Sequence, residues 1–435
     1  MTKKLTLTVL LLCVSMMLVF AGGAQEEAKP LGAAVEPKVV RITGQSWMIQ
    51  KILIEEAAER FMKDHPDVKV EILTYAEDSV ISNYAIDWSR GKTPVDIAIV
   101  QGAQFAAQFV ARDLIYNFDD ELDFFTGDFT RDKFVGVGLE SSKIQGVTYE
   151  IPLITEAYAL VINNKMFEEA GLVDAKGNPL VPKTWDEFYQ FAKKLHKVQG
   201  GVVVQQGASL QWSVTNTYAM LLATLRGARG TVYGDDGVSI SFDNPEFREI
   251  LRIWKKGADE GVFSKEMYGD HFAGRNSLMA NKLAMLVDSG SRWIEGASTL
   301  GKESVTVIPF PGADTNGSYG WGTGIIIPKA SPAPNLAMQF IKEQLLGQEV
   351  QTGTVNQYGK MPALLKYFEM AEDPEWAVMK TIADASGAPP TYKEFSKFQK
   401  ATPPILQNFL DGRLTLDQAI NEFEALVKSL DKSTI

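Results

Sequence analysis

The feature of this sequence that most limits its fold is a repeated alternation of short apolar runs with amphipathic segments. The run Val-Asp-Ile-Ala-Ile-Val at 95–100 is apolar at nearly every position and lies between segments with helical spacing. A strand that is apolar on both sides is buried on both faces, which is typical of a parallel sheet covered by helices. We therefore expect an α/β protein with doubly wound sheets.

The same alternation continues along the chain. Apolar patterns predict strands at 39–42, 68–72, 95–100, 158–162, 202–204, 283–287, 305–308 and 324–328. Apolar residues at helical spacing predict one helix from Ile49 to Phe61, and capping residues predict helices that begin at Thr184, Asn244 and Thr415. The strands fall into two groups and the sequence after Pro332 is mostly helical, so we expect two α/β units closed by C-terminal helices.

The first 24 residues have the features of a secretory signal peptide. Lys3 and Lys4 precede an apolar run from Leu5 to about Phe20, and small residues follow it. The run is shorter than the ~20 residues that span a bilayer, which argues against a membrane anchor. We expect residues 1–24 to be removed on export.

The part that remains after cleavage has a composition that excludes several classes of partner. Cys13, the only cysteine, lies in the middle of the apolar run, so we expect neither lipoprotein modification nor a disulfide. The whole chain has a net charge of −11, which becomes −13 without Lys3 and Lys4. Such an acidic protein is a poor partner for nucleic acid or anionic lipid. We expect a soluble, exported monomer, periplasmic or otherwise extracytoplasmic, whose first residues, 25–37, form a disordered tether.

No segment carries a recognisable catalytic or cofactor-binding motif. His65, His196 and His271 are not at metal-ligand spacing, and neither a phosphate-binding loop nor a Gly-x-Ser-x-Gly elbow is present. The acidic stretch at 119–132 lacks the glycine and the closing glutamate of a calcium loop, so a solvated surface is favoured over a calcium site. We expect no catalytic residue, metal or cofactor, although two carboxylates of a glycoside hydrolase are not excluded by counting.

Several segments resemble known motifs in a fixed order. They are Gly91–Ile97 (Gly-Lys-Thr-Pro-Val-Asp-Ile), the segments at 146–152 and 161–167, and Pro182–Phe188 (Pro-Lys-Thr-Trp-Asp-Glu-Phe). They resemble the family 1 extracellular solute-binding proteins of ABC importers, a group that includes maltodextrin-binding and other sugar-binding proteins. Asn163 stands where that family usually has tyrosine, and Val95 is inserted before its aspartate.

The resemblance implies a type II periplasmic-binding-protein-like fold with a ligand cleft between two lobes. The first lobe would hold residues 38–152 and 310–358, and the second would hold 153–309 and 359–435. It also implies a function, the capture of a sugar or oligosaccharide by hinge closure and its delivery to the membrane permease subunits of an ABC transporter. A second solute class, such as glycerol phosphate or a polyamine, and a secreted carbohydrate-active enzyme remain as alternatives.

Residues near strand ends and at the two lobe crossings are the candidates for binding. Ligands bind beyond the carboxyl ends of parallel strands, and sugars need aromatic platforms and planar polar groups. The resemblance places a ligand-binding acid at Glu156 and a ligand-binding region around Arg292. The candidates are Trp47, Gln101, Gln104, Glu156, Gln211, Trp212, Arg292, Trp293 and Trp321. Core packing is the alternative for each tryptophan, and we expect Trp185 and Trp254, on amphipathic helices, to be core.

Overall fold

The computed structural model describes residues 37–75 and 79–433. The predicted signal peptide, and all of the predicted tether except Pro37, lie outside the described residues. Residues from Lys38 onward form one unit. In the part of the chain that the structure describes, every helix is too short or too polar to cross a membrane.

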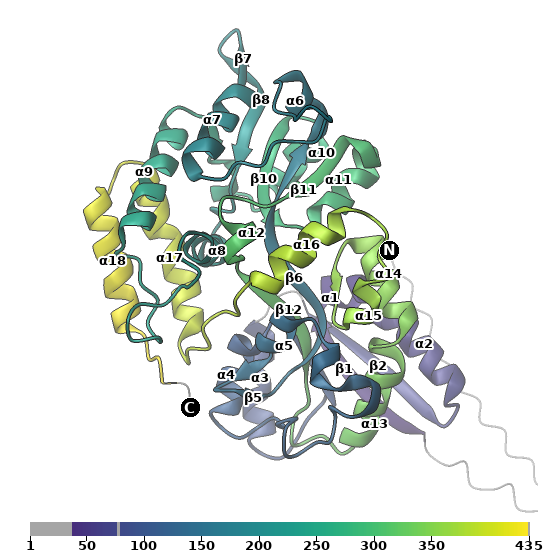
Figure 1. Cartoon of the computed structure of the whole chain (residues 1–435). Coiled ribbons are helices and arrows are strands. Elements are labelled where there is room, and N and C mark those ends of the chain that lie inside the picture. Colours follow the sequence, from purple (N-terminus) through teal and green to yellow (C-terminus); the bar gives the residue numbers. More distant parts are fainter. Residues whose placement is uncertain (1–36, 76–78, 434–435) are drawn as a thin grey trace, which may run out of the picture. The chain divides into compact units, whose positions relative to one another are not determined.

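A mixed sheet of eleven strands runs through this unit (Figure 1). Its main path is β2 (Val68–Tyr75), β1 (Lys38–Gln45), β3 (Ile97–Val100), β12 (Gly320–Ile326), β6 (Ile151–Asn163), β10 (Leu283–Ser289), β8 (Val202–Ser209) and β7 (Lys197–Gln199). Off this path, β11 (Val305–Ile308) and β13 (Met361–Pro362) pair with β6, and β9 (Phe263–Ser264) pairs with β8. A separate hairpin joins β4 (Lys143–Ile144) to β5 (Val147–Thr148).

The middle of the sheet consists of β6 and β12, which pair with each other in antiparallel fashion. Strand β6 is buried along all 13 of its residues and is longer than the predicted strand at 158–162. On one side β12 pairs with β3, which continues parallel to β1 and β2; on the other side β6 pairs with β10, which continues parallel to β8. Two groups of parallel strands are therefore joined through one antiparallel pair.

The continuous apolar run that ends at Val100 is explained by cores on both faces of β3. Ile97 and Ile99 pack into one cluster, together with α2 (Ile54–Asp64) and α13 (Pro334–Phe340). Ala98 and Val100 point to the other face and pack with α3 (Ser79–Trp88) and α4 (Ala103–Val110). Successive side chains of a strand point to opposite faces, so both faces must be apolar here.

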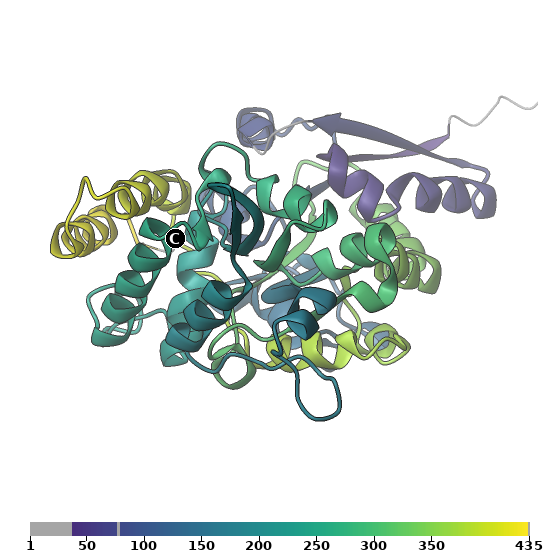
Figure 2. The same cartoon turned by 90° about the horizontal axis from the view of Figure 1, so that it is seen from above.

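A third and larger core surrounds β10 and β8. The helices that contribute to it are α7 (Trp185–Leu195), α8 (Thr217–Arg229), α9 (Pro245–Asp259), α10 (Ala273–Met279), α11 (Arg292–Leu300), α16 (Glu375–Ala385), α17 (Phe395–Leu410) and α18 (Leu416–Ser429). Figure 2 shows α17 and α18 side by side and next to α9. Trp185 and Trp254 are buried in this core, as predicted. The exact lobe boundaries stay a prediction.

Three predicted helix starts are confirmed by side-chain caps. The side chain of Thr184 accepts a hydrogen bond from the backbone of Glu187, and Asn244 does the same for Phe247. Thr415 and Gln418 form a complete capping box at α18. These caps satisfy backbone N–H groups that have no partner within the helix.

The single helix predicted from Ile49 to Phe61 is wrong, because the chain breaks between α1 (Ser46–Lys51) and α2. Leu53 adopts a left-handed backbone with φ of 54°, which a non-glycine residue takes only at a cost of about 1–2 kcal/mol. Ile52 and Leu53 are both buried at this bend. We infer that burying both side chains offsets the strained backbone, which helical periodicity alone does not reveal.

Candidate functional site

Glu156 lies in the middle of β6, directly opposite Trp321 on β12. Only 4% of Glu156 is exposed. Its carboxylate accepts hydrogen bonds from the hydroxyls of Ser289 (2.7 Å) and Ser291 (3.3 Å), which lie at and just beyond the end of β10. The crossing strand therefore carries a buried acid where the two groups of strands meet.

Lys360 supplies the positive charge beside this acid. It follows Gly359, whose left-handed backbone (φ 64°) ends α14 (Gln348–Tyr358). Lys360 Nζ donates to Glu156 and to the Ser291 hydroxyl (3.3 Å), and it lies 5.8 Å from the centre of the Trp47 ring. Burial lowers the pKa of Lys360 to about 8, with the Glu156 charge opposing this shift.

A second buried acid, Asp288, lies one residue before Ser289 on β10. Arg275 on α10 donates to both of its oxygens, at 2.7 and 3.3 Å, and Arg292 Nε lies 3.6 Å from it. Gln211 Nε2 also donates to Asp288. Burial acts to raise the pKa of Asp288, but Arg275 and Arg292 hold that pKa below its ordinary value. Asp288 is therefore an ionised acid that accepts hydrogen bonds from Arg275 and Gln211 and forms an ion pair with Arg292.

These two acids and their partners form one polar cluster. Arg292, which donates to Glu295 on the same helix, also interacts electrostatically with Glu156 and so links the two halves. We call this set the crossing cluster. Its members are Glu156, Gln211, Arg275, Asp288, Ser289, Ser291, Arg292, Glu295 and Lys360.

Aromatic rings lie next to the crossing cluster on β12 and β6. The Trp321 ring lies 5.6 Å from the Tyr158 ring and 5.3 Å from the Tyr319 ring, between centroids. Trp321 is half-buried, and so is Trp47 on α1, whose indole N–H donates to Gln45. Partly exposed rings beside fixed donors and acceptors are the elements that a sugar site needs.

The structure brings together five of the nine predicted residues. Glu156, Gln211 and Arg292 belong to the crossing cluster; Trp321 lies opposite Glu156, and Trp47 lies beside Lys360.

The other four predicted residues lie elsewhere. Trp212 and Trp293 are 0% and 1% exposed in the core around β10, which favours the packing role for both. Gln101 and Gln104 lie at the start of α4, where Gln104 donates to the Gln101 carbonyl (2.7 Å). Within the described residues, neither glutamine is hydrogen-bonded to the crossing cluster. Their binding roles stay predictions.

Sequence reasoning missed six members of the crossing cluster: Arg275, Asp288, Ser289, Ser291, Glu295 and Lys360. Asp288 and Ser289 end an apolar strand, and the strand-end rule that selected Gln101 applies equally to them. Arg275 lies on a helix, and Lys360 lies 204 residues from Glu156 along the chain. Only the packing of distant elements brings Lys360 to Glu156, whereas Arg275 reaches Asp288, 13 residues away, from the helix just before β10.

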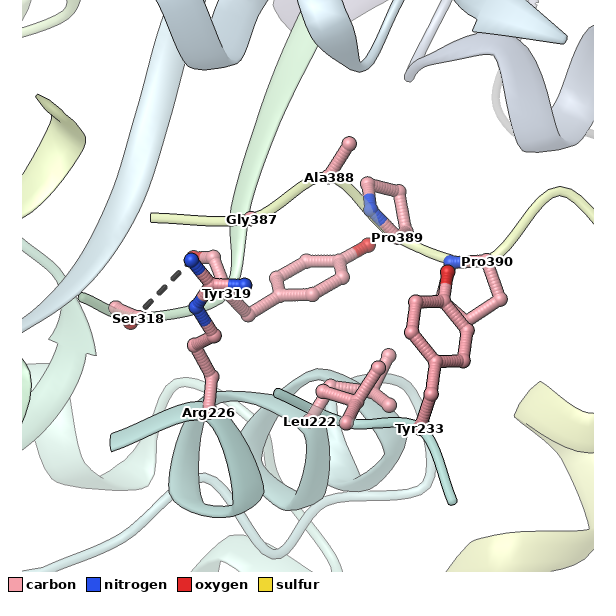
Figure 3. Close-up of a pocket in the computed structure, with 10 residues that line it drawn as sticks. Leu222, Arg226, Tyr233, Ser318, Tyr319, Gly387, Ala388, Pro389 and Pro390 are labelled. Carbon is pink, nitrogen blue, oxygen red and sulfur yellow. Dashed lines mark hydrogen bonds between the residues drawn. The ribbon is translucent and has the colours of Figure 1, made fainter. Parts of the chain in front are cut away.

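The cavity shown in Figure 3 is too small to hold a sugar. It lies between α8, Tyr319 and the segment 387–390, with Arg226 and Tyr233 in its wall. Its volume is about 20 Å³, which is room for one water molecule. We therefore take the crossing cluster and its aromatic neighbours, not this cavity, as the candidate binding site.

Metal-binding geometry is not found in the described ranges 37–75 and 79–433, where no three His, Cys, Asp or Glu side chains come together to hold an ion. In the acidic stretch, Asp119 is paired with Arg131 and accepts from the backbone N–H of Thr148 (2.9 Å).

A further buried acid, Glu150, lies just before β6 and is 0% exposed. Neither carboxylate oxygen makes a hydrogen bond of normal geometry with a described residue, although the Gly102 backbone is close enough to act on the carboxyl. Gly324 lies so close that an added Cβ would meet Glu150 Oε1 at 2.4 Å, next to the shift in register between Thr323 and Gly324. Burial raises the pKa of Glu150 well above its ordinary value, and the Gly102 backbone opposes this only in part. Folding therefore favours the protonated, neutral form of Glu150.

Glu150→Gln should make the free energy of unfolding less sensitive to rising pH. Because the pKa of Glu150 is raised by folding, wild type loses stability as pH rises above the unfolded value, by up to about 1.4 kcal/mol per pH unit. The glutamine variant has no such loss, so its advantage in urea unfolding should grow from pH 5 to pH 8. Parallel stability profiles for the two proteins would contradict a neutral Glu150.

Comparison with known proteins gives a consistent family assignment. A family model described as bacterial extracellular solute-binding protein matches residues 48–345. A putative binding protein of Brucella abortus is 26% identical over 281 residues, which is 63% of each chain. The chain thus spans less than two thirds of the length of that relative.

Two further comparisons extend the match. The arabinooligosaccharide-binding protein of Bacillus subtilis is 24% identical over 78% of this chain and 76% of its own. An ABC transporter solute-binding protein of Thermotoga lettingae, solved with alpha-D-tagatose, aligns with a TM-score of 0.72 at 20% identity, covering 90% of this chain and 99% of that one. At this identity the likeness shows a shared fold.

Proposed function

The chain belongs to the bacterial extracellular solute-binding protein family, and on that premise we propose that it is the exported substrate-binding component of an ABC importer. Its solute is a sugar or oligosaccharide, bound at the crossing cluster between two lobes and passed to the membrane permease. The family and the fold are those of binding proteins rather than enzymes. The observation that carries the proposal is the half-buried Trp321 directly opposite Glu156 at the strand crossing.

Separate cores support a two-lobed mechanism. The clusters around β1 and β3 draw their residues mainly from the first 154 positions and from 325–367, and the cluster around β10 draws mainly from the rest. Each lobe keeps its own core when the two move apart, so hinge bending need not expose either one. A solute that contacts both lobes then favours the closed form, because only that form offers both sets of contacts.

The charges of the crossing cluster favour a neutral, hydroxyl-rich solute. Its three cations, Arg275, Arg292 and Lys360, are paired with three acids, Asp288, Glu295 and Glu156. A phosphate ester would need unpaired cations, and a polyamine would need unpaired acids. Paired charges still present oriented donors and acceptors, which suit sugar hydroxyls.

The same charges argue against glycoside hydrolysis at this site. A glycosidase needs one carboxyl with a raised pKa as the acid. Although both are buried, neighbouring cations lower the pKa of Glu156 and of Asp288, so both remain ionised. We infer that the crossing cluster binds its solute without cleaving it.

A thermal-shift screen tests the proposed function. The mature protein should be mixed with maltotriose, arabinotriose and D-tagatose, with glycerol 3-phosphate and spermidine as the competing solute classes. A sugar at about 100 times its Kd stabilises the folded state by about 2.7 kcal/mol, which for a chain of this length we expect to raise Tm by about 3 °C. A shift with glycerol 3-phosphate or spermidine alone would overturn the sugar assignment, and cleavage of the sugar would overturn the binding-only role.

A further inference from the structure

An ion pair joins α1 to α11, two helices that pack into different cores and lie outside the crossing strands. Lys51 Nζ on α1 lies 3.1 Å from Glu295 Oε1 on α11, although the residues are 244 positions apart. Helix α1 buries Met48 and Ile49 in the core around β1, and α11 buries Trp293 in the core around β10. The pair therefore forms only when these two cores are close together.

Glu295 also belongs to the candidate site. Arg292, one helical turn earlier, donates to Glu295 and lies 3.6 Å from Asp288. Positive and negative groups thus alternate from Lys51 through Glu295 and Arg292 to Asp288. Although burial acts to raise it, Arg292 and Lys51 hold the pKa of Glu295 below its ordinary value, so the carboxylate remains charged. A change at Lys51 reaches the site through Glu295.

The surroundings of the pair make it more stabilising than most surface salt bridges. The side chains of Lys51 and Glu295 are 25% and 23% exposed. Lys51 Nζ also lies 5.8 Å from the centre of the Tyr358 ring, two residues before Lys360. Partial burial reduces the screening by water and salt that makes most surface pairs weak.

We propose that Lys51 is a positioning residue for solute binding: its ion pair with Glu295 stabilises the closed form and orients Arg292 toward Asp288. The proposal rests on the proposed function, in that closure is what retains the solute. Because the pair needs the two cores to be close together, its free energy adds to closure and should slow solute release more than it changes solute entry.

Three variants separate this role from general loss of charge. Lys51→Met removes the ion pair and keeps the aliphatic side chain, and Lys51→Arg keeps the charge. Lys183→Met is the matched control. Lys183 and Asp314 form a pair of similar length (2.9 Å), but both adjoin residues of the same core, Trp185 and Ala313.

The separation of the two cores is measured with spin labels in ligand-free protein. The labels are attached at Lys63→Cys and Thr299→Cys, which are exposed on helices of different cores.

We expect Lys51→Met to shift the ligand-free label distances to longer values and to raise koff for maltotriose, or the sugar found by the screen, by about threefold to tenfold. Lys51→Arg should keep the ligand-free label distances of wild type and a koff within about twofold of wild type. Lys183→Met should match wild type in both measurements. Identical behaviour of Lys51→Met and Lys183→Met would overturn the proposal. If no sugar binds wild type, the proposed function fails, while the ligand-free distances still decide whether Lys51 holds the closed form.

Discussion

Asp288→Asn should lower the free energy of unfolding by about 3–5 kcal/mol and reduce solute binding below detection. Asp288 is fully ionised in the fold and is the shared partner of Arg275, Arg292 and Gln211. Asparagine has the same size but no charge, so the buried guanidinium of Arg275 loses its counter-charge and that of Arg292 keeps only its pair with Glu295. The remaining donors would no longer be held in place for the solute.

Urea unfolding and calorimetric titration measure the two parts of this expectation. Asp259→Asn is the matched control, because Asp259 forms an exposed pair with Lys255 on α9; we expect a change within about 0.5 kcal/mol. The pKa of Asp288 is lowered by folding, so its contribution is present above the unfolded value of about 3.9 and is lost as pH falls through the folded pKa. A fully stable Asp288→Asn protein would show that the pairs with arginine do not hold the site together.

Trp293→Ala should be the more destabilising of two tryptophan replacements and Trp47→Ala the more damaging to binding. Trp293 is 1% exposed and its ring lies 6.0 Å from that of Trp376, so its removal leaves a large cavity and should cost about 3–5 kcal/mol. Trp47 is half-buried beside Lys360, and we expect its loss to raise Kd at least about tenfold with a stability change near 1 kcal/mol.

Both variants should be followed by chemical denaturation and by titration with the sugar identified in the screen. Trp254→Ala is a reference for core loss, because Trp254 is 0% exposed in the same core as Trp293. Weak binding by Trp293→Ala at unchanged stability would return Trp293 to the binding site. A stable Trp47→Ala protein with unchanged affinity would remove Trp47 from it.

Much of the secondary structure was predictable because the local pattern and the tertiary structure agree. The apolar run that ends at Val100 requires burial on both faces, and both cores are present. The caps at Thr184 and Thr415 depend on contacts within four residues. The break at Leu53 was not predictable, because the strain is offset by packing with residues far away in the sequence.

The residues of the candidate site also divide into those that the sequence predicted and those that depend on tertiary packing. Glu156 and Trp321 were found from the family resemblance and their place at the crossings. Trp212 and Trp293 satisfy similar positional rules, yet both are fully buried. Position relative to a strand end indicates which residues are near the crossing, but the direction of a side chain depends on how the helices pack around it.

The sequence by itself determined the α/β class, the strand order along the chain and the family, because apolar periodicity and short motifs are properties of neighbouring residues. The tertiary structure alone decided which charges meet. Lys360 reaches Glu156, and Lys51 reaches Glu295, only after segments 204 and 244 residues apart pack together. A charge has no periodicity that reveals its partner, whereas burial without a partner is costly, so the fold itself selects these pairs.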